Sequence, residues 1–414
     1  MKTRWRVPLL LSAALVLAQL FHLAPLNDVV RGTVPPDVHL AWPLTHIALA
    51  PFTLLADWLN GGSRADLINF GIWLVVGYLV ARLIAAPSGP PPAARRLRIE
   101  ASTAACCVIA AALFVWWGAR WNRPIPRLVT DDSTLIVVDA HSHTSASHDG
   151  RQGFGTAANA AWHVRAGFDA AFVTDHNVVG AARQWRLDAG DRPPRLLPGE
   201  ELSLSGLHIL ALGLDSLIKP KPWDATFDSS LRLLDLLSRQ PSAVGRQPFL
   251  VASLPEYWEH HWGADLGRLA DAGVRGFEVW TTSPRAMDFP PEARGTLIAR
   301  AGSNGLTLLG ATDMHGLGNT ASVWNVVRLP GWRRLDDAQL TGALLEVLRD
   351  APQDVRVIAL RRALPGSRPG RAFAAPLGVI TALRAASRGH ALALLLWIWL
   401  PWLLFRGRRA VASR

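Results

Sequence analysis

The sequence predicts an α/β domain with a mainly parallel sheet or barrel, flanked by membrane-spanning segments. Over residues 127–350, apolar strand-like runs alternate with segments of helical spacing, a pattern typical of parallel α/β folds. Both ends of the chain are more apolar than this middle part, which explains a hydrophobic content of 50% in 414 residues. The mean hydropathy of +0.18 is too high for an ordinary soluble protein. Length alone allows two or three domains.

The apolar segments before residue 127 are interpreted as membrane segments, three or four in number. The first follows a basic start and is predicted to be an uncleaved anchor rather than a signal peptide. Residues 41–58 are apolar but broken by Pro43 and Pro51, so a re-entrant segment and a poor span are both open. The predicted spans are residues 7–26, 67–86 and 101–117.

The predicted domains follow from these changes in composition. Residues 1–126 form the N-terminal membrane region, 127–352 the α/β domain, 353–388 a basic linker, and 389–414 a C-terminal transmembrane helix with a basic tail. The formal charge of +11 comes mainly from arginines beside apolar segments. Such arginines fix topology and contact anionic lipid, so no nucleic acid is expected as a partner.

Topology depends on the number of spans. With three N-terminal spans and one C-terminal span, the positive-inside rule places the basic flanks in the cytoplasm and the α/β domain outside it. The prediction is therefore an integral protein of a bacterial inner membrane with an extracytoplasmic domain. If residues 41–58 also cross, the domain faces the cytoplasm.

Within the middle domain, polar residues gather where predicted strands end, the edge at which parallel α/β folds build their chemistry. The predicted helices are residues 157–166, 230–238, 266–272 and 292–304. The predicted strands are residues 134–140, 168–174, 196–203, 208–214, 249–253, 276–280 and 307–312.

The first of these strands ends in a motif that indicates a metal site. Because side chains alternate along a strand, Asp139, His141 and His143 are expected on one face. Two imidazoles so placed can bind one metal ion, whereas exposed histidines on a loop are the ordinary alternative. Asp313 and His315 repeat this spacing at the last strand. Imidazole and carboxylate ligands without thiolate suit Zn, Mn or Fe.

These motifs, in this order, resemble the polymerase and histidinol phosphatase (PHP) family over about residues 134–316. The matching stretches begin at His141, Thr174, Gly199 and Asp313, with a histidine, His208, shortly after Glu201. The resemblance implies a distorted TIM-like (β/α)7 barrel with two or three divalent ions, Zn, Mn or Fe, per chain. It also implies a metal-dependent phosphoesterase.

The resemblance also implies a role for each ligand. His141, His143 and Asp313 would hold the first metal, Glu201 would bridge two metals, and His208 would serve the second. His176 and His315 would serve a third, completed by His148 or Asp149, between which the spacing does not decide. Among these, His176, Glu201 and His315 are also the expected catalytic residues, with a histidine of the rim assisting the leaving group.

One position departs from the family pattern. Where a histidine precedes proline in the family, this chain has Leu254 before Pro255, so the second metal lacks a ligand unless His260, His261 or a water molecule replaces it. The simpler interpretation of that pair is a solvated loop.

Four further residues near the motifs receive simpler interpretations. Asp175 is expected to orient His176, Glu200 to be a solvated neighbour of Glu201, and His163 to be structural; Glu278 is left unassigned.

The expected reaction is hydrolysis of a phosphoester by a hydroxide that bridges two metal ions. The expected substrate is a phosphorylated small molecule or a lipid-linked phosphate, with membrane lipid as a further partner. Arg151 or Arg285 could clamp the phosphate. One alternative is a catalytically impaired module that binds a phosphorylated ligand at the membrane, favoured by Leu254. Another is a hydrolase of the same architecture that cleaves a non-phosphate bond.

Overall fold

The structure is a computed structural model that describes residues 5–84, 93–189, 194–214, 216–239, 247–283, 286, 289–318, 320–361 and 372–411. Residues 362–371 of the predicted basic linker and Arg285 lie outside these residues. The chain divides into two compact units. The first contains Met1–Leu23, Pro43–Pro124 and Arg362–Arg414, and the second contains Ala24–Trp42 and Ile125–Arg361.

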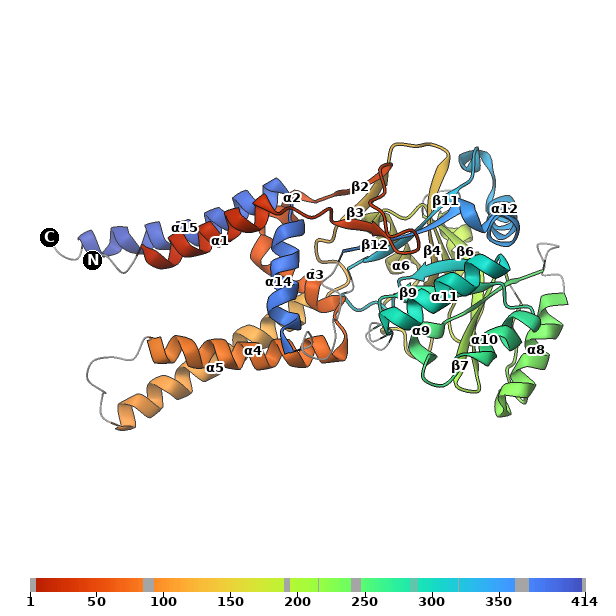
Figure 1. Ribbon diagram of the computed structural model, residues 1–414, viewed down its shortest axis with the longest axis horizontal. Coiled ribbons are helices and arrows are strands. Elements are labelled where there is room, and N and C mark those ends of the chain that lie inside the picture. Colours follow the sequence, from red (N-terminus) through yellow and green to blue (C-terminus); the bar gives the residue numbers. More distant parts are fainter. Residues whose placement is uncertain are drawn as a thin grey trace. The chain divides into compact units, whose positions relative to one another are not determined.

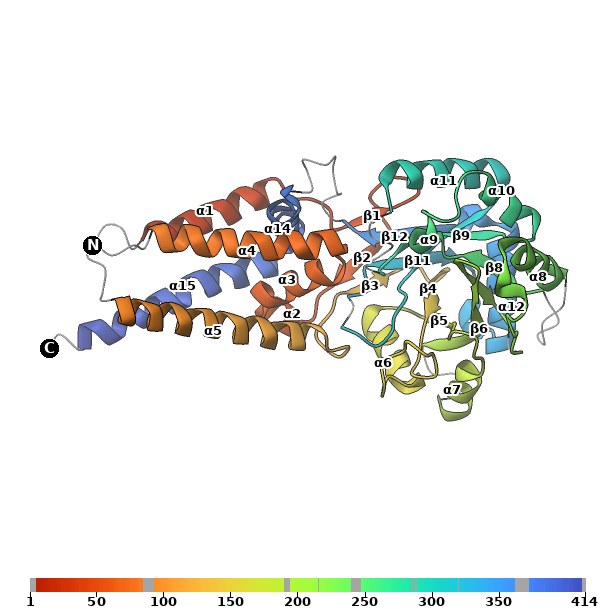
Figure 2. The same cartoon turned by 90° about the horizontal axis from the view of Figure 1, so that it is seen from below.

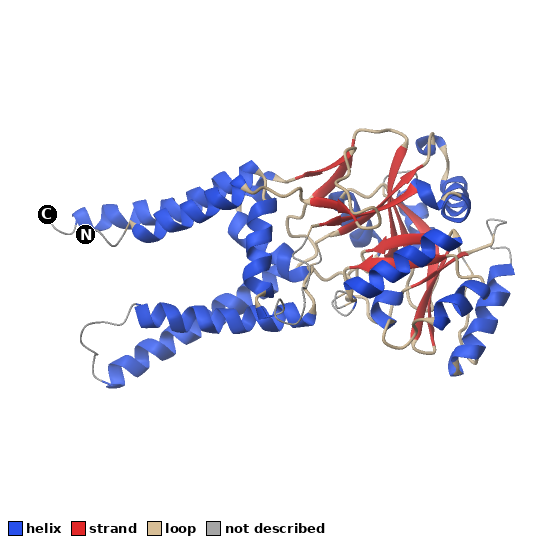
Figure 3. Cartoon of the chain, viewed as in Figure 1, coloured by secondary structure: helices blue, strands red, loops and turns tan. Residues whose placement is uncertain are grey.

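The first unit is helical (Figures 1 and 3). Its described helices are α1 (Arg6–Leu20), α2 (Leu44–Ala48), α3 (Ala50–Asn60), α4 (Arg64–Ile84), α5 (Ala93–Gly118), α14 (Ala374–Ala385) and α15 (Arg388–Val411). In Figure 1 α1 lies along α15, where Trp399 donates a hydrogen bond to the hydroxyl of Ser12 at 3.0 Å, and Tyr78 of α4 donates to Glu100 of α5 at 2.7 Å. The predicted spans at 67–86 and 101–117 coincide with α4 and α5.

Two of these helices are long and apolar enough to cross a membrane, through Ala65–Arg82 and Leu97–Gly118. Few or none of their residues are buried, 6% and 0% respectively, so their apolar side chains need another apolar surrounding. Helices α14 and α15 give a third candidate if they count as one span bent by 117°. These helices are compatible with membrane association.

Two predicted membrane segments are shorter than expected. Helix α1 has 15 residues and ends at Leu20, not at residue 26. At about 1.5 Å per residue such a helix covers less than the roughly 30 Å of a bilayer core. Residues 41–58 form the short helices α2 and α3 on either side of Leu49, because the backbone turns there before Pro51.

A buried polar chain joins several of these helices. His46 contacts His390 through Nδ1 at 2.9 Å and Asp57 through Nε2 at 2.8 Å. Asp57 also accepts a hydrogen bond from the buried Arg123 guanidinium at 2.7 Å, and Ser387 contacts Nδ1 of His390 at 2.7 Å. Pairing of this kind offsets the cost of burying charge among apolar helices.

The second unit is built on a curled sheet of ten strands. Their order is β1-β12-β11-β4-β5-β6-β7-β8-β9-β10. In chain order these strands are β1 (Leu26–Asp28), β4 (Leu135–Ser142), β5 (Ala170–Val173), β6 (Arg195–Leu204), β7 (Leu207–Leu212), β8 (Phe249–Ala252), β9 (Gly276–Thr281), β10 (Thr307–Ala311), β11 (Val323–Arg328) and β12 (Val355–Leu360). A separate antiparallel pair is β2 (Val38–Ala41) and β3 (Arg127–Thr130).

The curl brings the last parallel strand back to the first. Beyond β10, the N–H of Asp313 donates to the carbonyl of His141 at 3.0 Å, and the N–H of His143 donates to the carbonyl of Met314 at 2.9 Å. The buried Asn325 amide of β11 links the same two strands, donating to Gly310 at 2.7 Å and Val138 at 3.1 Å. The carboxyl ends of β4 and β10 therefore lie side by side.

Helices lie on both sides of the sheet in Figure 2, with α10 and α11 on one side and α6 and α7 on the other. One apolar core packs β6 to β9 against α8, α10 and α11. A second packs α12 against residues of β4 to β8 and β10 to β12. These helices are α6 (Thr156–Ala166), α7 (Ala181–Ala189), α8 (Phe227–Arg239), α9 (Leu254–Tyr257), α10 (Ala264–Asp271), α11 (Pro291–Asn304) and α12 (Asp337–Asp350).

The mixed α/β architecture agrees with the prediction, and the seven predicted strands correspond to β4 to β10. The regular alternation of a TIM-like (β/α)7 barrel is interrupted, because β6 turns directly into β7 and β7 runs antiparallel to both neighbours. The linker predicted from residue 353 is wrong over Val355–Leu360. That stretch forms β12, whose apolar residues are mostly buried between β1 and β11.

Candidate metal centre

Histidines and carboxylates converge at the carboxyl ends of the strands. His141 lies in β4 and His143 directly after it, while Asp313 follows β10, whose end lies beside that of β4. Asp313 has a φ of 50°, a left-handed backbone that is uncommon outside glycine and typical of functional sites. Glu201 in β6 and His176 after β5 face each other across a β-bridge. The parallel strands thus deliver these groups to one place.

Glu201 is at the centre of this cluster. Its Oε2 atom lies 3.0 Å from Nε2 of His141, 3.1 Å from Nε2 of His143 and 3.3 Å from Nε2 of His176. Its Oε1 atom lies 2.7 Å from Nδ1 of His208 in β7. One carboxylate therefore faces four imidazoles, and three of their nitrogens point at a single oxygen.

The side chains form three groups whose ligand atoms lie within 4.8 Å of one another. Asp313 lies at the edge of the first group, with Oδ1 3.2 Å from His143 Nε2 and 3.4 Å from His141 Nε2. The groups are His141, His143 and Glu201; His176, Glu201 and His208; and His143, Asp149, His176 and His315.

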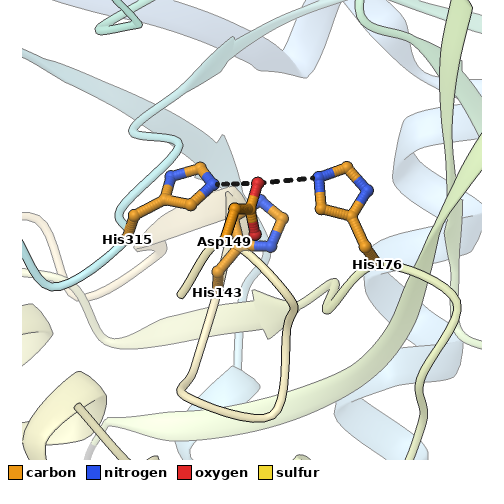
Figure 4. Close-up of side chains that lie close together, drawn as sticks. All are labelled: His143, Asp149, His176 and His315. Carbon is orange, nitrogen blue, oxygen red and sulfur yellow. Dashed lines mark hydrogen bonds and ion pairs between the residues drawn. The ribbon is translucent and has the colours of Figure 1, made fainter. Parts of the chain in front are cut away.

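Figure 4 shows how Asp149 joins the third group. Its Oδ2 atom lies 3.1 Å from His176 Nε2 and 3.0 Å from His315 Nε2. The ring of His148 packs beside that of His176, with centroids 4.8 Å apart, but belongs to none of the groups. A Cβ atom at Gly150 would overlap the carbonyl of Thr144, so only glycine allows this tight loop. Of the two candidates His148 and Asp149, it is Asp149 whose side chain contacts both His176 and His315.

In three of the histidines an oxygen atom contacts Nδ1, which leaves Nε2 as the atom that can bind a metal. Nδ1 of His141 contacts Glu278 at 2.7 Å, Nδ1 of His176 contacts Ser203 at 3.1 Å, and Nδ1 of His315 contacts the Asp313 carbonyl at 2.7 Å. Such a partner selects the tautomer whose Nε2 carries a lone pair, as in metal-binding histidines. The donor set and its orientation therefore fit divalent metal ions.

The charges of the cluster shift one another's pKa values. Burial opposes protonation of His141, but Glu201, Asp313 and Glu278 outweigh it and raise its pKa well above the usual range. Burial likewise opposes protonation of His143, yet hydrogen bonds to Asp313 and Glu201 raise its pKa to about 9. The carboxylates respond in the opposite sense: burial would raise the pKa of Glu201, but His141 lowers it well below its usual value. Glu201 and Asp313, whose pKa is also lowered, are therefore available as anionic ligands, whereas burial raises the pKa of Glu278.

Asp139 does not share a face with the two histidines, contrary to the expectation from alternation. The register shifts between Asp139 and Ser142, which turns the Asp139 side chain toward α6. There its Oδ2 atom contacts Nε2 of His163 at 2.9 Å and the hydroxyl of Thr312. Its Oδ1 atom accepts from the N–H of Thr312 at 3.2 Å. Asp139 and the structural His163 thus support both metal-binding motifs from behind.

The residue missing from the family pattern is not replaced by the histidine pair. Leu254 is fully buried in the apolar core. His260 is exposed, whereas His261 is buried rather than solvated, stacked on Phe227 and bonded to the Ser205 carbonyl at 3.0 Å. Neither belongs to the metal-binding groups.

Several neighbouring residues have other roles than the sequence predicted. Glu278 lies behind His141, and its second oxygen accepts from Ser253 at 2.7 Å. Glu200 is buried rather than solvated; it accepts from the N–H of Ile218 at 3.0 Å, and burial raises its pKa to about 7. Asp175 accepts two hydrogen bonds from Thr144. No sequence signal indicated Tyr257, whose hydroxyl lies 2.9 Å from His208 Nε2.

Comparison with solved structures finds partial, distant similarity. A two-domain protein from Bacteroides vulgatus, containing a predicted PHP-like metal-dependent phosphoesterase, is 18% identical with a TM-score of 0.35 and covers 51% of this chain and 65% of its own. PsfC from Pseudomonas syringae is 19% identical, with a TM-score of 0.38, over 61% of this chain and 98% of its own. An amidohydrolase from Chromobacterium violaceum is 17% identical, with a TM-score of 0.30, over 47% and 92%.

No protein-family model matches the chain, and comparison with curated proteins finds no relative. This chain spans less than two thirds of the length of the Bacteroides vulgatus protein. Function is therefore argued from the residues of the site.

Proposed function

We propose that this chain is a membrane-anchored, metal-dependent phosphoesterase whose second unit carries the active site. The observation that carries the proposal is the convergence of three imidazole Nε2 atoms, within 3.3 Å, on Oε2 of Glu201. Imidazole nitrogens grouped around a shared carboxylate oxygen are a ligand set that suits divalent cations. The nature of the donors, with no thiolate among them, favours Zn, Mn or Fe.

The three groups assign the ligands. His141, His143, Glu201 and Asp313 would hold one ion; Glu201 and His208 would hold a second; and Asp149 and His315 would hold a third, with Nε2 of His176 serving either the second or the third. Divalent ions bound here would lower the pKa of a water molecule and neutralise charge on phosphoryl oxygens. Two or three ions per chain are expected.

The chain's own residues orient these ligands and expose part of the cluster to substrate. His141 and His143 are buried, whereas the side chain of His315 is 21% exposed. In a site with two ions His315 is not needed as a ligand and would protonate the leaving oxygen at the rim; in a site with three ions its Nε2 binds the third ion instead. Arg151 is exposed on the same rim, its guanidinium 3.2 Å from the Gly316 carbonyl, where it can bind a phosphate.

The proposed substrate class rests on the basic rim of the site and on the apolar helices. A basic group beside a cation site suits a phosphorylated small molecule or a lipid-linked phosphate. The apolar helices α4 and α5 favour work at a membrane. An active site outside the cytoplasm is proposed on the positive-inside rule and requires that α1 cross the membrane together with α4 and α5.

The test uses the full-length protein purified in detergent. Metal content is measured by elemental analysis, and hydrolysis is followed with an aryl phosphate monoester, an aryl phosphate diester and an aryl amide. His143→Ala is compared with His260→Ala, which changes an exposed histidine outside the groups. We expect metal-dependent hydrolysis of a phosphate ester by the wild type and His260→Ala, with a loss of at least about 100-fold in His143→Ala.

A second candidate function is a module that binds a phosphorylated ligand without turnover. Leu254 favours it, because this buried side chain cannot coordinate a metal ion. A fully metal-loaded protein that binds inorganic phosphate but cleaves none of the esters would favour it. Cleavage of the amide alone would point instead to a hydrolase acting on a non-phosphate bond.

A further inference from the structure

We propose that Tyr257 is a metal ligand of the group formed by His176, Glu201 and His208. The inference rests on the proposed metal centre and adds an oxygen ligand to it from a residue type that occurs only twice in the chain. Nothing in the sequence marks this tyrosine, because it lies four residues beyond Ser253 in a segment without a recognisable motif.

The local backbone places the phenol at the cluster. Strand β8 ends at Ala252, and the single-turn helix α9 begins at once, with Pro255 in its first turn. Leu254 packs into the apolar core, whereas Tyr257, at the other end of this turn, faces His208. The hydroxyl of Tyr257 lies 2.9 Å from Nε2 and 3.3 Å from Nδ1 of His208.

The spacing of the oxygen atoms is that of ligands around one ion. Nδ1 of His208 lies between Oε1 of Glu201, at 2.7 Å, and the Tyr257 hydroxyl, at 3.3 Å. In the first group, ligand atoms of His141, His143 and Asp313 lie 3.0 to 3.4 Å apart. The phenol oxygen lies as close to a ligand nitrogen of its group, Nδ1 of His208, as Asp313 lies to those of the first group.

The chemistry of this group explains why an oxygen is needed. It offers the imidazole of His208, the imidazole of His176 that the third group shares, and the carboxylate of Glu201 that the first group shares, whereas zinc and iron sites take four or more ligands. A phenolate is an anionic oxygen donor that binds iron, and its proton leaves to solvent when the metal binds. Tyr257 thus supplies both the missing ligand and a negative charge.

A neutral phenol that only orients His208 would make the same contact. Loss of activity on mutation would not separate these roles, but tyrosinate bound to Fe³⁺ absorbs visible light and a hydrogen-bonded phenol does not. The chain also provides a matched control, since its other tyrosine, Tyr78, lies in α4 and bonds to Glu100.

The experiment strips full-length protein in detergent with a chelator and reloads it with Fe³⁺ or, separately, with Zn²⁺. Wild type, Tyr257→Phe and Tyr78→Phe are compared by visible absorption, metal content and thermal unfolding. We expect a tyrosinate band in the wild type and Tyr78→Phe that Tyr257→Phe lacks. We also expect Tyr257→Phe to bind one Zn²⁺ fewer per chain, or to bind it at least tenfold more weakly.

Three results would overturn the assignment: a wild type that takes up Fe³⁺ without the band, a wild type that takes up none, or a band that persists in Tyr257→Phe. The wild-type spectrum needs no variant, so it decides even if Tyr257→Phe fails to fold. Failure of the proposed function gives a different result, in which the band is present while no phosphate ester is hydrolysed.

Discussion

Nδ1 of His141 lies 2.7 Å from Oε1 of Glu278, and both side chains are buried. Because Nδ1 is engaged, Nε2 is left to face Glu201 and His143. This buried carboxylate comes from β9, across the sheet from the histidine that it orients. In the proposed metal centre it would orient this ligand without binding the ion itself.

Glu278→Gln is expected to weaken metal binding by about 10- to 100-fold, because an amide holds the imidazole less firmly and no longer makes it more basic. The measurement is a titration of chelator-treated protein with Zn²⁺. Glu259→Gln, on an exposed residue, is the control and should bind as the wild type does. Equal affinities for Glu278→Gln and wild type would show that Glu278 does not orient His141.

Two adjacent glutamates in β6 provide a matched pair. Glu201 faces the histidines, whereas Glu200 accepts from Ile218. We expect Glu201→Gln to lose most of the bound metal, because a neutral amide cannot replace a carboxylate shared by two groups. Glu200→Gln keeps a hydrogen-bond acceptor and should retain the metal. Elemental analysis of both variants decides, and similar metal content in the two would contradict the central role of Glu201.

Stability of the metal-free protein should depend on pH through His143. Its pKa rises from 6.5 to about 9 in the fold, since the carboxylates around it outweigh burial. The stabilisation from this proton is therefore complete below about pH 6.5 and is lost as the pH rises through about 9.

Thermal unfolding of chelator-treated protein should occur at a lower temperature at pH 9.5 than at pH 6.5. His143→Gln cannot bind this proton and should show a smaller decrease. A midpoint that rises over this range would contradict the pairing. Metal affinity should rise over the same range, because the metal replaces the proton.

The buried polar chain of the helical unit predicts a stability effect away from the active site. Asp57→Ala removes the carboxylate that faces both Arg123 and His46, and should cost about 3–5 kcal/mol because a buried guanidinium then lacks its counter-charge. Asp66→Ala removes a carboxylate that accepts from the N–H of Ser63 at a helix start and should cost about 1 kcal/mol. Tryptophan fluorescence during heating in detergent compares them. A smaller effect for Asp57→Ala than for Asp66→Ala would contradict this role.

The sequence predicted the parts of this protein that depend on local pattern. Short apolar runs between helical segments indicated β4 to β10, because these strands are buried. Long apolar stretches indicated α4 and α5, because these helices expose apolar side chains along their length. Strands β11 and β12 were not recognised: β11 lies in the predicted domain beyond the last motif, and β12 lies in the predicted linker. Strand β12 pairs with β11 and with the distant β1, a long-range relationship with no local signal.

By itself, the sequence determined which side chains stand at strand ends, and so which residues were candidates to meet: His141, His143, Glu201, Asp313 and His315. Only the tertiary structure decided which partners they have. A register shift turns Asp139 away, a tight loop brings Asp149 rather than His148 between two histidines, and Glu278 comes from β9 and Tyr257 from α9. Spacing along a strand is set by backbone geometry, whereas contacts between strands depend on how the sheet curls and on how the loops at its edge are packed.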